Sequence, residues 1–207
     1  SHQEHVKHKP TSFGDWLAKT IVHLSALTAT LLFKKRYGHR AIVLETIAAV
    51  PGMVGGTLQH LKALRLIRDD RGWIKALVDE AENERMHLMV YSEITQPTVF
   101  ERFLIVIVQI FFFIIFFILY FISANTAHRV VGYFEEEAVH SYETYLKLVH
   151  EGMFENIPAT ALSKSYWKLA DNARLTDVIK ATIVDEMLHR DVNHKFADDY
   201  HASVWRN

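Results

Sequence analysis

The 207-residue sequence contains no cysteine, only four prolines and eight glycines, and almost no net charge. The absence of cysteine excludes disulfides, thiolate zinc sites, iron–sulfur clusters and any switch based on thiol oxidation. A formal net charge of −1 provides no basic field for nucleic acid, so we expect no nucleic-acid partner. Scarce glycine and proline, with weak alternation of polar and apolar residues, favour an all-α fold. Because the chain begins with serine and shows no signal or transit segment, we interpret it as a mature or trimmed form.

The length suits a single domain over residues 1–207. Apolar periodicity predicts four bundle helices at about 41–67, 73–94, 127–150 and 175–200, and a short helix around Tyr166. Residues 1–12, which include some of the 13 histidines, are expected to form a disordered, solvated tail. Pro51 and Gly52 fall inside the first bundle helix, where small residues would let a neighbouring helix approach closely or the helix would kink.

A Glu-x-x-His pattern occurs at Glu84–His87 and again, far along the chain, at Glu186–His189. Residues three apart share one face of a helix, so in each copy the carboxylate and the imidazole point the same way. A third copy at Glu137–His140 shows that one match alone is weak and fits a solvated helix face equally well. The order of acids along the chain is more informative: one helix supplies Glu, the next supplies Glu-x-x-His, and the pair repeats. That order is the ligand set of a ferritin-like di-iron four-helix bundle, and it comprises Glu45, Glu84, His87, Glu135, Glu186 and His189.

The chemistry of these side chains suits a pair of iron ions. Four carboxylates carry a charge of about −4, which two Fe(II) ions would neutralise, and both carboxylate and imidazole are good ligands for iron in its Fe(II) and Fe(III) states. Glu45 lies in a run with few other polar side chains, where an uncompensated buried carboxylate would be costly. Asn83 and Asp185 each precede the Glu of a Glu-x-x-His copy, so we expect them to be hydrogen-bond partners in the outer shell. Tyr142 shares a helix face with Glu135, either as a redox or hydrogen-bonding partner or as an ordinary core tyrosine.

Two further segments, 15–33 and 103–122, are long and apolar. The first ends in the basic run Lys34-Lys35-Arg36, a pattern typical of a helix on an anionic membrane surface and also of an amphipathic core helix. The second is long enough to cross a bilayer. A crossing would place Glu84 and Glu135 on opposite sides, whereas a shared metal site needs them together. We therefore expect both helices to lie in one leaflet, with burial in a larger assembly as the alternative for 103–122.

The sequence resembles the alternative oxidases, cyanide-insensitive quinol oxidases of the mitochondrial inner membrane. The resemblance covers roughly residues 37–198 and is carried by Leu44-Glu45-Thr46, Pro51-Gly52-Met53-Val54-Gly55-Gly56, Asn83-Glu84-Arg85-Met86-His87-Leu88, Val131-Gly132-Tyr133, Glu135-Glu136-Glu137-Ala138 and Asp185-Glu186-x-x-His189-Arg190. It implies a centre of two iron ions held by the six residues above, and it removes Glu137 and His140 from the ligand set. It implies a homodimer bound to one leaflet through the two apolar helices, peripheral on the matrix side of the inner membrane.

The resemblance also implies roles for individual residues. Tyr142 would be the redox-active, catalytic tyrosine. A quinol pocket would be lined by Arg40, Leu44, Ala138 and Ser141. Trp73 and Tyr166 would occupy positions that are functional or structural in the family. His128 and Trp167 would join Asn83 and Asp185 around the metal ligands.

We therefore expect a ubiquinol oxidase that reduces dioxygen to water without pumping protons. The nearest alternative is another membrane-surface di-iron enzyme that hydroxylates a quinone ring. A ferroxidase or iron store would not need the two apolar helices. A non-catalytic membrane-binding helical protein would leave the apolar setting of Glu45 unexplained.

Overall fold

The structure is a computed structural model that describes residues 7–33 and 36–201, and within these ranges it contains seven helices and no strand. This confirms the predicted all-α class. The first six residues and Lys34-Lys35, which were predicted to belong to a solvated tail and a basic run, lie outside the described residues.

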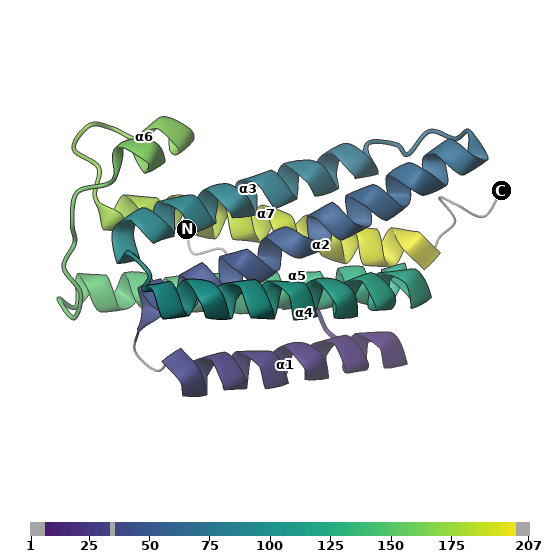
Figure 1. Cartoon of the computed structure of the whole chain (residues 1–207), viewed down its shortest axis with the longest axis horizontal. Helices are drawn as coiled ribbons and strands as arrows, with labels where there is room; N and C mark the ends of the chain where they lie inside the picture. Colours follow the sequence, from purple (N-terminus) through teal and green to yellow (C-terminus); the bar gives the residue numbers. More distant parts are fainter. Residues whose placement is uncertain (1–6, 34–35, 202–207) are drawn as a thin grey trace.

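Four long helices form the bundle: α2 (Tyr37–Leu66), α3 (Trp73–Thr95), α5 (Ala124–His150) and α7 (Leu175–His201). The helices run along the long axis of the molecule (Figure 1). α2 packs mainly on α3 and α5 mainly on α7, so the bundle consists of two pairs. The short helix α6 (Ala161–Trp167) lies in the connection between α5 and α7. The predicted bundle helices agree with these bounds to within four residues at each end.

Close approach of α2 to α3 depends on the small residues predicted to allow it. A Cβ atom built on Gly52 would lie 2.3 Å from the carbonyl oxygen of Leu77, and one on Gly56 would lie 3.2 Å from Val78. Pro51 is accommodated inside α2 at the same level. Larger side chains here would push the two helices apart, and with them the acidic residues that each helix carries.

Helices α1 (Phe13–Phe33) and α4 (Val99–Ile122) lie outside the four-helix bundle, and α1 packs mainly on α5 (Figure 1). α2 and α4 are both long and apolar enough to cross a membrane, but 56% of the apolar window of α2 is buried, against 11% of that of α4. Both α1 and α4 expose large apolar side chains, among them Trp16, Leu24, Phe103, Phe111 and Phe121.

The chain reverses direction sharply after α4. Thr98 and Glu101 form a capping box at the start of α4, and Ser123 alone separates α4 from α5 while its hydroxyl accepts the backbone N–H of Thr126. Contacts of Phe112 with Phe134 and of Tyr120 with His128 show that α4 and α5 run antiparallel. α4 therefore returns the chain along the bundle, as a shared site requires.

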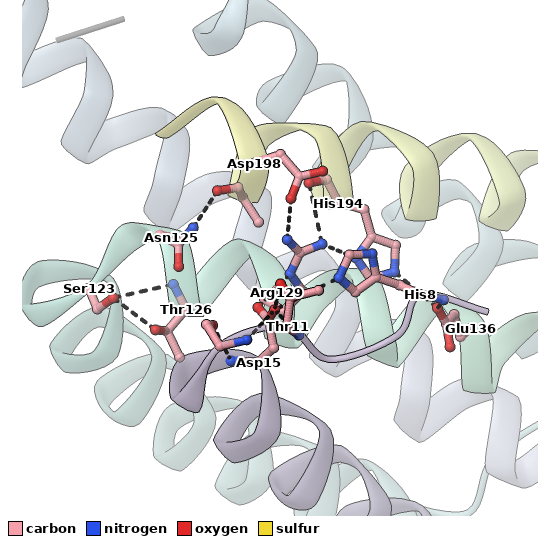
Figure 2. A network of polar contacts seen from close by, with 12 residues as sticks. His8, Thr11, Asp15, Ser123, Asn125, Thr126, Arg129, Glu136, His194 and Asp198 are labelled. Carbon is pink, nitrogen blue, oxygen red and sulfur yellow. Dashed lines mark hydrogen bonds and ion pairs between the residues drawn. The ribbon is translucent and has the colours of Figure 1, made fainter. Parts of the chain in front are cut away.

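The segment before α1 differs from the predicted tail, because residues 7–12 pack against the bundle. The backbone N–H of His8 donates to Glu136 at 2.7 Å, and its ring stacks on that of His194 with centroids 4.7 Å apart. Figure 2 shows how this segment meets the buried guanidinium of Arg129, which donates to Asp15 of α1 at 2.9 Å and to Asp198 of α7. Apolar periodicity gave no indication of these contacts, since they join polar side chains from three separate elements.

Candidate metal centre

All four bundle helices direct metal-binding side chains into one buried volume. In each of the two helix pairs, one helix supplies a single carboxylate and the other supplies a carboxylate and an imidazole. As whole residues, the four glutamates retain at most 2% of their surface and the two histidines at most 9%. The structure thus brings together all six predicted residues, Glu45 from α2, Glu84 and His87 from α3, Glu135 from α5, and Glu186 and His189 from α7.

The six residues form two overlapping groups, each with ligand atoms within 4.8 Å of one another. One group contains Glu45 and His87, the other contains Glu135 and His189, and both include Glu84 and Glu186. Two carboxylates are thus placed between two metal positions, with one further carboxylate and one imidazole at each end. This arrangement would hold two metal ions, with Glu84 and Glu186 available to both and Glu45 and Glu135 each available to one.

Both imidazoles turn Nδ1 toward the carboxylates. His87 Nδ1 lies 3.3 Å from an oxygen of Glu45 and 3.3 Å from an oxygen of Glu186, and His189 Nδ1 lies 2.6 Å from Glu84. These nitrogens, both oxygens of Glu84 and of Glu186, and one of Glu45 are nevertheless buried without a hydrogen bond of acceptable geometry among the described residues. Donors that converge without bonding to one another fit a shared cation, and the mixture of carboxylate and imidazole suits iron.

The charges in the site are strongly coupled. Burial and the neighbouring carboxylates of Glu84 and Glu186 raise the pKa of Glu45 well above its ordinary value, and burial with Glu186 raises that of Glu135. Burial alone would lower the pKa of His87, but the nearby carboxylates raise it well above its ordinary value. The volume therefore favours the uptake of positive charge, either as protons or as metal ions that displace them.

Outside the cluster, Asp185 acts as the acceptor for three donors. Its Oδ2 atom lies 3.1 Å from His87 Nε2 and accepts the indole N–H of Trp167 at 2.8 Å and the amide of Asn83 at 3.1 Å. The ring of Trp167 also stacks on His87 with centroids 5.6 Å apart. Asp185 and Trp167 thus lie in the predicted outer shell, and they fix His87 as the tautomer with a proton on Nε2.

Asn83 reaches this shell differently from its predicted role. Its amide donates to Asp185 and, at 2.5 Å, to the hydroxyl of Tyr166, and among the described residues it forms no hydrogen bond with either imidazole. His128 is also indirect: His128 Nδ1 bonds to Asn193 Oδ1 at 3.0 Å, and the Asn193 amide donates to the backbone carbonyl of His189. The ring of Trp73 packs edge-on against His128. Burial lowers the pKa of His128 to about 4, so this imidazole is neutral at physiological pH.

Tyr142 is buried beside the cluster, and its hydroxyl donates to Glu45. Its ring stacks on Tyr91 with centroids 5.3 Å apart, and the Tyr91 hydroxyl bonds to Thr182 at 3.1 Å. Only one of these two tyrosines therefore has a carboxylate as its acceptor. The carboxylate gives Tyr142 a place to deliver a proton, whereas a threonine hydroxyl is a poor base.

A cavity of about 460 Å³ leads to the cluster from between α1, α2, α4 and α5. Its inner end is formed by the cluster carboxylates, and its walls include Phe111 and Phe112 of α4. Of the predicted pocket residues, Arg40, Leu44 and Ala138 line the cavity, whereas Ser141 is not among its described lining residues.

Several residues of this region were not predicted from the sequence. α1 supplies one wall through residues such as Ser25 and Thr28, and Glu137 lines the cavity although it is not a ligand. Glu80 is buried near the cluster and accepts the Asn193 amide at 2.8 Å, and burial raises its pKa to about 7. A signal for Glu80 was present, since it lies one helical turn before Glu84 on the same face.

Comparison with known proteins is consistent with this geometry. A family model described as "Alternative oxidase" matches residues 1–198. "Ubiquinol oxidase 2, mitochondrial" of Glycine max is 54% identical over 194 residues, which are 94% of this chain and 58% of that protein. "Ubiquinol oxidase 1a, mitochondrial" of Arabidopsis thaliana is 52% identical over 194 residues, 94% of this chain and 54% of that protein. "Ubiquinol oxidase, mitochondrial" of Batrachochytrium dendrobatidis is 50% identical over 189 residues, 91% of this chain and 60% of that protein. The chain therefore spans somewhat more than half the length of these curated relatives.

Proposed function

The chain belongs to the alternative oxidase family, and from this premise we propose that it is a ubiquinol oxidase, which passes electrons from ubiquinol to dioxygen and forms water. The observation that carries the proposal is the apolar cavity that is lined by α1 and α4 and by the cluster carboxylates. A hydrophobic quinol can leave the lipid and reach the cluster without crossing water. By family membership we propose in addition that the reaction is insensitive to cyanide and pumps no protons.

The cofactor we propose is a pair of iron ions held by the six cluster residues. Glu84 and Glu186 could serve both ions because they belong to both ligand groups. When bound, the pair supplies the redox chemistry that joins a two-electron donor to dioxygen. The protein excludes water from this volume through burial, and it fixes one imidazole through Asp185.

Tyr142 is proposed as the catalytic tyrosine. Its hydroxyl donates to Glu45, which is itself a wall of the cavity, so a proton can move between phenol and carboxylate over a single hydrogen bond. Burial, with Glu45 and Tyr91, raises the pKa of Tyr142 well above its ordinary value. Its proton therefore stays on the phenol unless an electron leaves the ring with it.

The quinol headgroup is proposed to lie between Arg40, Leu44 and Ala138. Among the described residues that line the cavity, Arg40 supplies the one cationic side chain, and it donates to the hydroxyl of Thr30 of α1 at 3.3 Å. A guanidinium at this position can donate to a quinol oxygen, while Leu44 and Ala138 contact the ring. The predicted contribution of Ser141 to the quinol pocket remains a prediction, since Ser141 is not among the described residues that line this cavity.

We also propose that α1 and α4 lie in one leaflet, on the matrix side of the mitochondrial inner membrane. Their exposed apolar side chains fit a lipid surface, and the antiparallel return of α5 keeps the bundle on one side. The proposed homodimer would use a different face, where α2 and α3 expose Met53, Leu64, Val78 and Met89.

Oxygen uptake by purified, iron-loaded protein with a short-chain ubiquinol, measured in cyanide, tests the function. We expect the unaltered protein to take up oxygen and to form the quinone as its sole organic product. In Glu135→Gln we expect oxygen uptake to fall to background. Mass analysis of that product separates the oxidase from a quinone-ring hydroxylase, whose product would be heavier by one oxygen. The proposal would be overturned if protein shown to contain iron took up no oxygen.

A further inference from the structure

The two halves of the cluster match in sequence but not in their surroundings. Each Glu-x-x-His copy is preceded by a polar residue, Asn83 before Glu84 and Asp185 before Glu186. If the outer shell were symmetric, each of these residues would support the imidazole of the opposite helix. Only one of them does so.

His87 receives the full support. Its Nε2 atom lies 3.1 Å from Asp185, whose carboxylate is held by Trp167 and Asn83, and its side chain is completely buried. An anionic acceptor on the outer nitrogen fixes the tautomer and makes Nδ1 a stronger metal ligand.

His189 has no equivalent partner. The amide of Asn83, which occupies the matching position, is turned toward Asp185 and Tyr166. Within residues 7–33 and 36–201, no side chain forms a hydrogen bond or ion pair with His189 Nε2, and 11% of the His189 side chain remains exposed. The nearby carboxyl of Glu80 accepts its hydrogen bond from Asn193 instead.

We propose that the two metal positions differ in affinity, and that the position formed by Glu45, Glu84, His87 and Glu186 binds its ion more tightly than the position that contains His189. The proposal rests on the di-metal function above and assigns Asp185 as the positioning residue that creates the difference. Both positions share Glu84 and Glu186 and each adds one further carboxylate. They differ in the outer partner of the imidazole and in the Tyr142 hydroxyl that donates to Glu45, and the Asp185 variants below isolate the first difference. Loss of such a partner typically costs about 10–100-fold in metal affinity, which sets the size of the difference we expect.

Cobalt(II) titration of the metal-free protein, followed by its visible absorption and by calorimetry, tests the proposal without reference to turnover. Shared carboxylates can couple the two ions, so each position is measured alone. His189→Gln leaves the His87 position, and His87→Gln leaves the His189 position. We expect His189→Gln to bind one ion at least tenfold more tightly than His87→Gln. Circular dichroism of each variant checks that the bundle is intact.

Adding Asp185→Asn to each background identifies the cause. In the His189→Gln background we expect affinity to fall by about 10–100-fold. In the His87→Gln background, where the partner of Asp185 is already absent, we expect less than a threefold change. Asp191→Asn on the same helix is the control, because its side chain is 66% exposed and pairs with Arg190.

The outcomes separate this inference from the function it rests on. Equal affinities in the two single-position variants, or an equal loss from Asp185→Asn in both backgrounds, would overturn the inequality and leave the oxidase proposal standing. Failure of the unaltered protein to bind any Co(II) would overturn the di-metal function and the inequality together.

Discussion

The buried contact between α1 and the bundle predicts that Asp15→Asn destabilises the protein. Asp15 accepts the guanidinium of Arg129 through one oxygen and the backbone N–H groups of Thr11 and Ser12 through the other (Figure 2). The side chains of Asp15 and Arg129 are each 3% exposed, so solvent screens their interaction little. Burial alone would raise the pKa of Asp15, but these partners lower it from 3.8 to about 2.

The size of the effect follows from this pKa. At about 1.4 kcal/mol for each pKa unit, the change corresponds to about 2.5 kcal/mol of folding stability. Removing one member of a buried ion pair costs about 3–5 kcal/mol when the other is left alone. Arg129 keeps Asp198 as a partner, so we expect a loss of about 2–3 kcal/mol at pH 7.

The sign of the pH dependence is also fixed. Because the folded-state pKa of Asp15 is below the unfolded value, its contribution is complete well above pH 3.8 and is lost as the pH falls toward 2. At pH 3 we expect the difference between the unaltered protein and Asp15→Asn to be about half of that at pH 7.

Unfolding in a mild detergent at both pH values measures the difference, and hydrogen exchange shows whether α1 loosens first. Asp79→Asn is the control, since Asp79 is 61% exposed and pairs with the exposed Lys75 one turn earlier in α3. A change below about 0.5 kcal/mol for Asp15→Asn at pH 7, the size expected of an ordinary surface substitution, would refute the reasoning.

Three further outcomes are expected. Tyr142→Phe should lower oxygen uptake at least tenfold with metal content unchanged, whereas Tyr91→Phe, whose hydroxyl meets only a threonine, should lower it far less; equal losses would remove the special role of Tyr142. Gly132→Ala should cost about 1–3 kcal/mol in unfolding assays, because its Cβ would lie 2.6 Å from the ring of His194; an unchanged melting curve would contradict the tight α5–α7 contact. Glu80→Gln should stabilise metal-stripped protein by up to about 3 kcal/mol at pH 8 and hardly at pH 4.5, because the raised folded-state pKa of about 7 makes its ionisation a cost that grows between these values; the same effect at both pH values would show that ionisation is not the cause.

The sequence predicts best what one helix determines by itself. The spacing of Glu84 and His87 places both on one face of α3 whatever surrounds them, and the apolar run around Glu45 shows that this carboxylate is buried. The repeated order of acids then suffices to predict that four helices converge. The bounds of the bundle helices follow to within four residues, whereas α4 begins at Val99, four residues before the predicted apolar segment, because the capping box of Thr98 and Glu101 starts it.

What the sequence does not predict depends on contacts between distant segments. The matching positions of Asn83 and Asp185 suggest a symmetric outer shell, but Tyr166 in the α5–α7 connection competes for the Asn83 amide and breaks that symmetry. The packing of His8 on His194 joins residues 186 positions apart and leaves no periodic pattern in either segment. The position of α1, which forms one wall of the cavity, likewise depends on a long-range contact, that of Asp15 with Arg129.

The single residue between α4 and α5 has a mechanical consequence. With Ser123 capping one helix as it ends the other, there is no flexible tether to absorb movement between them. A tilt of α4 would therefore also move α5, the helix that carries Glu135. In the proposed placement of α4 in one leaflet, the thickness and lateral pressure of the bilayer would thereby act on the spacing of the buried carboxylates.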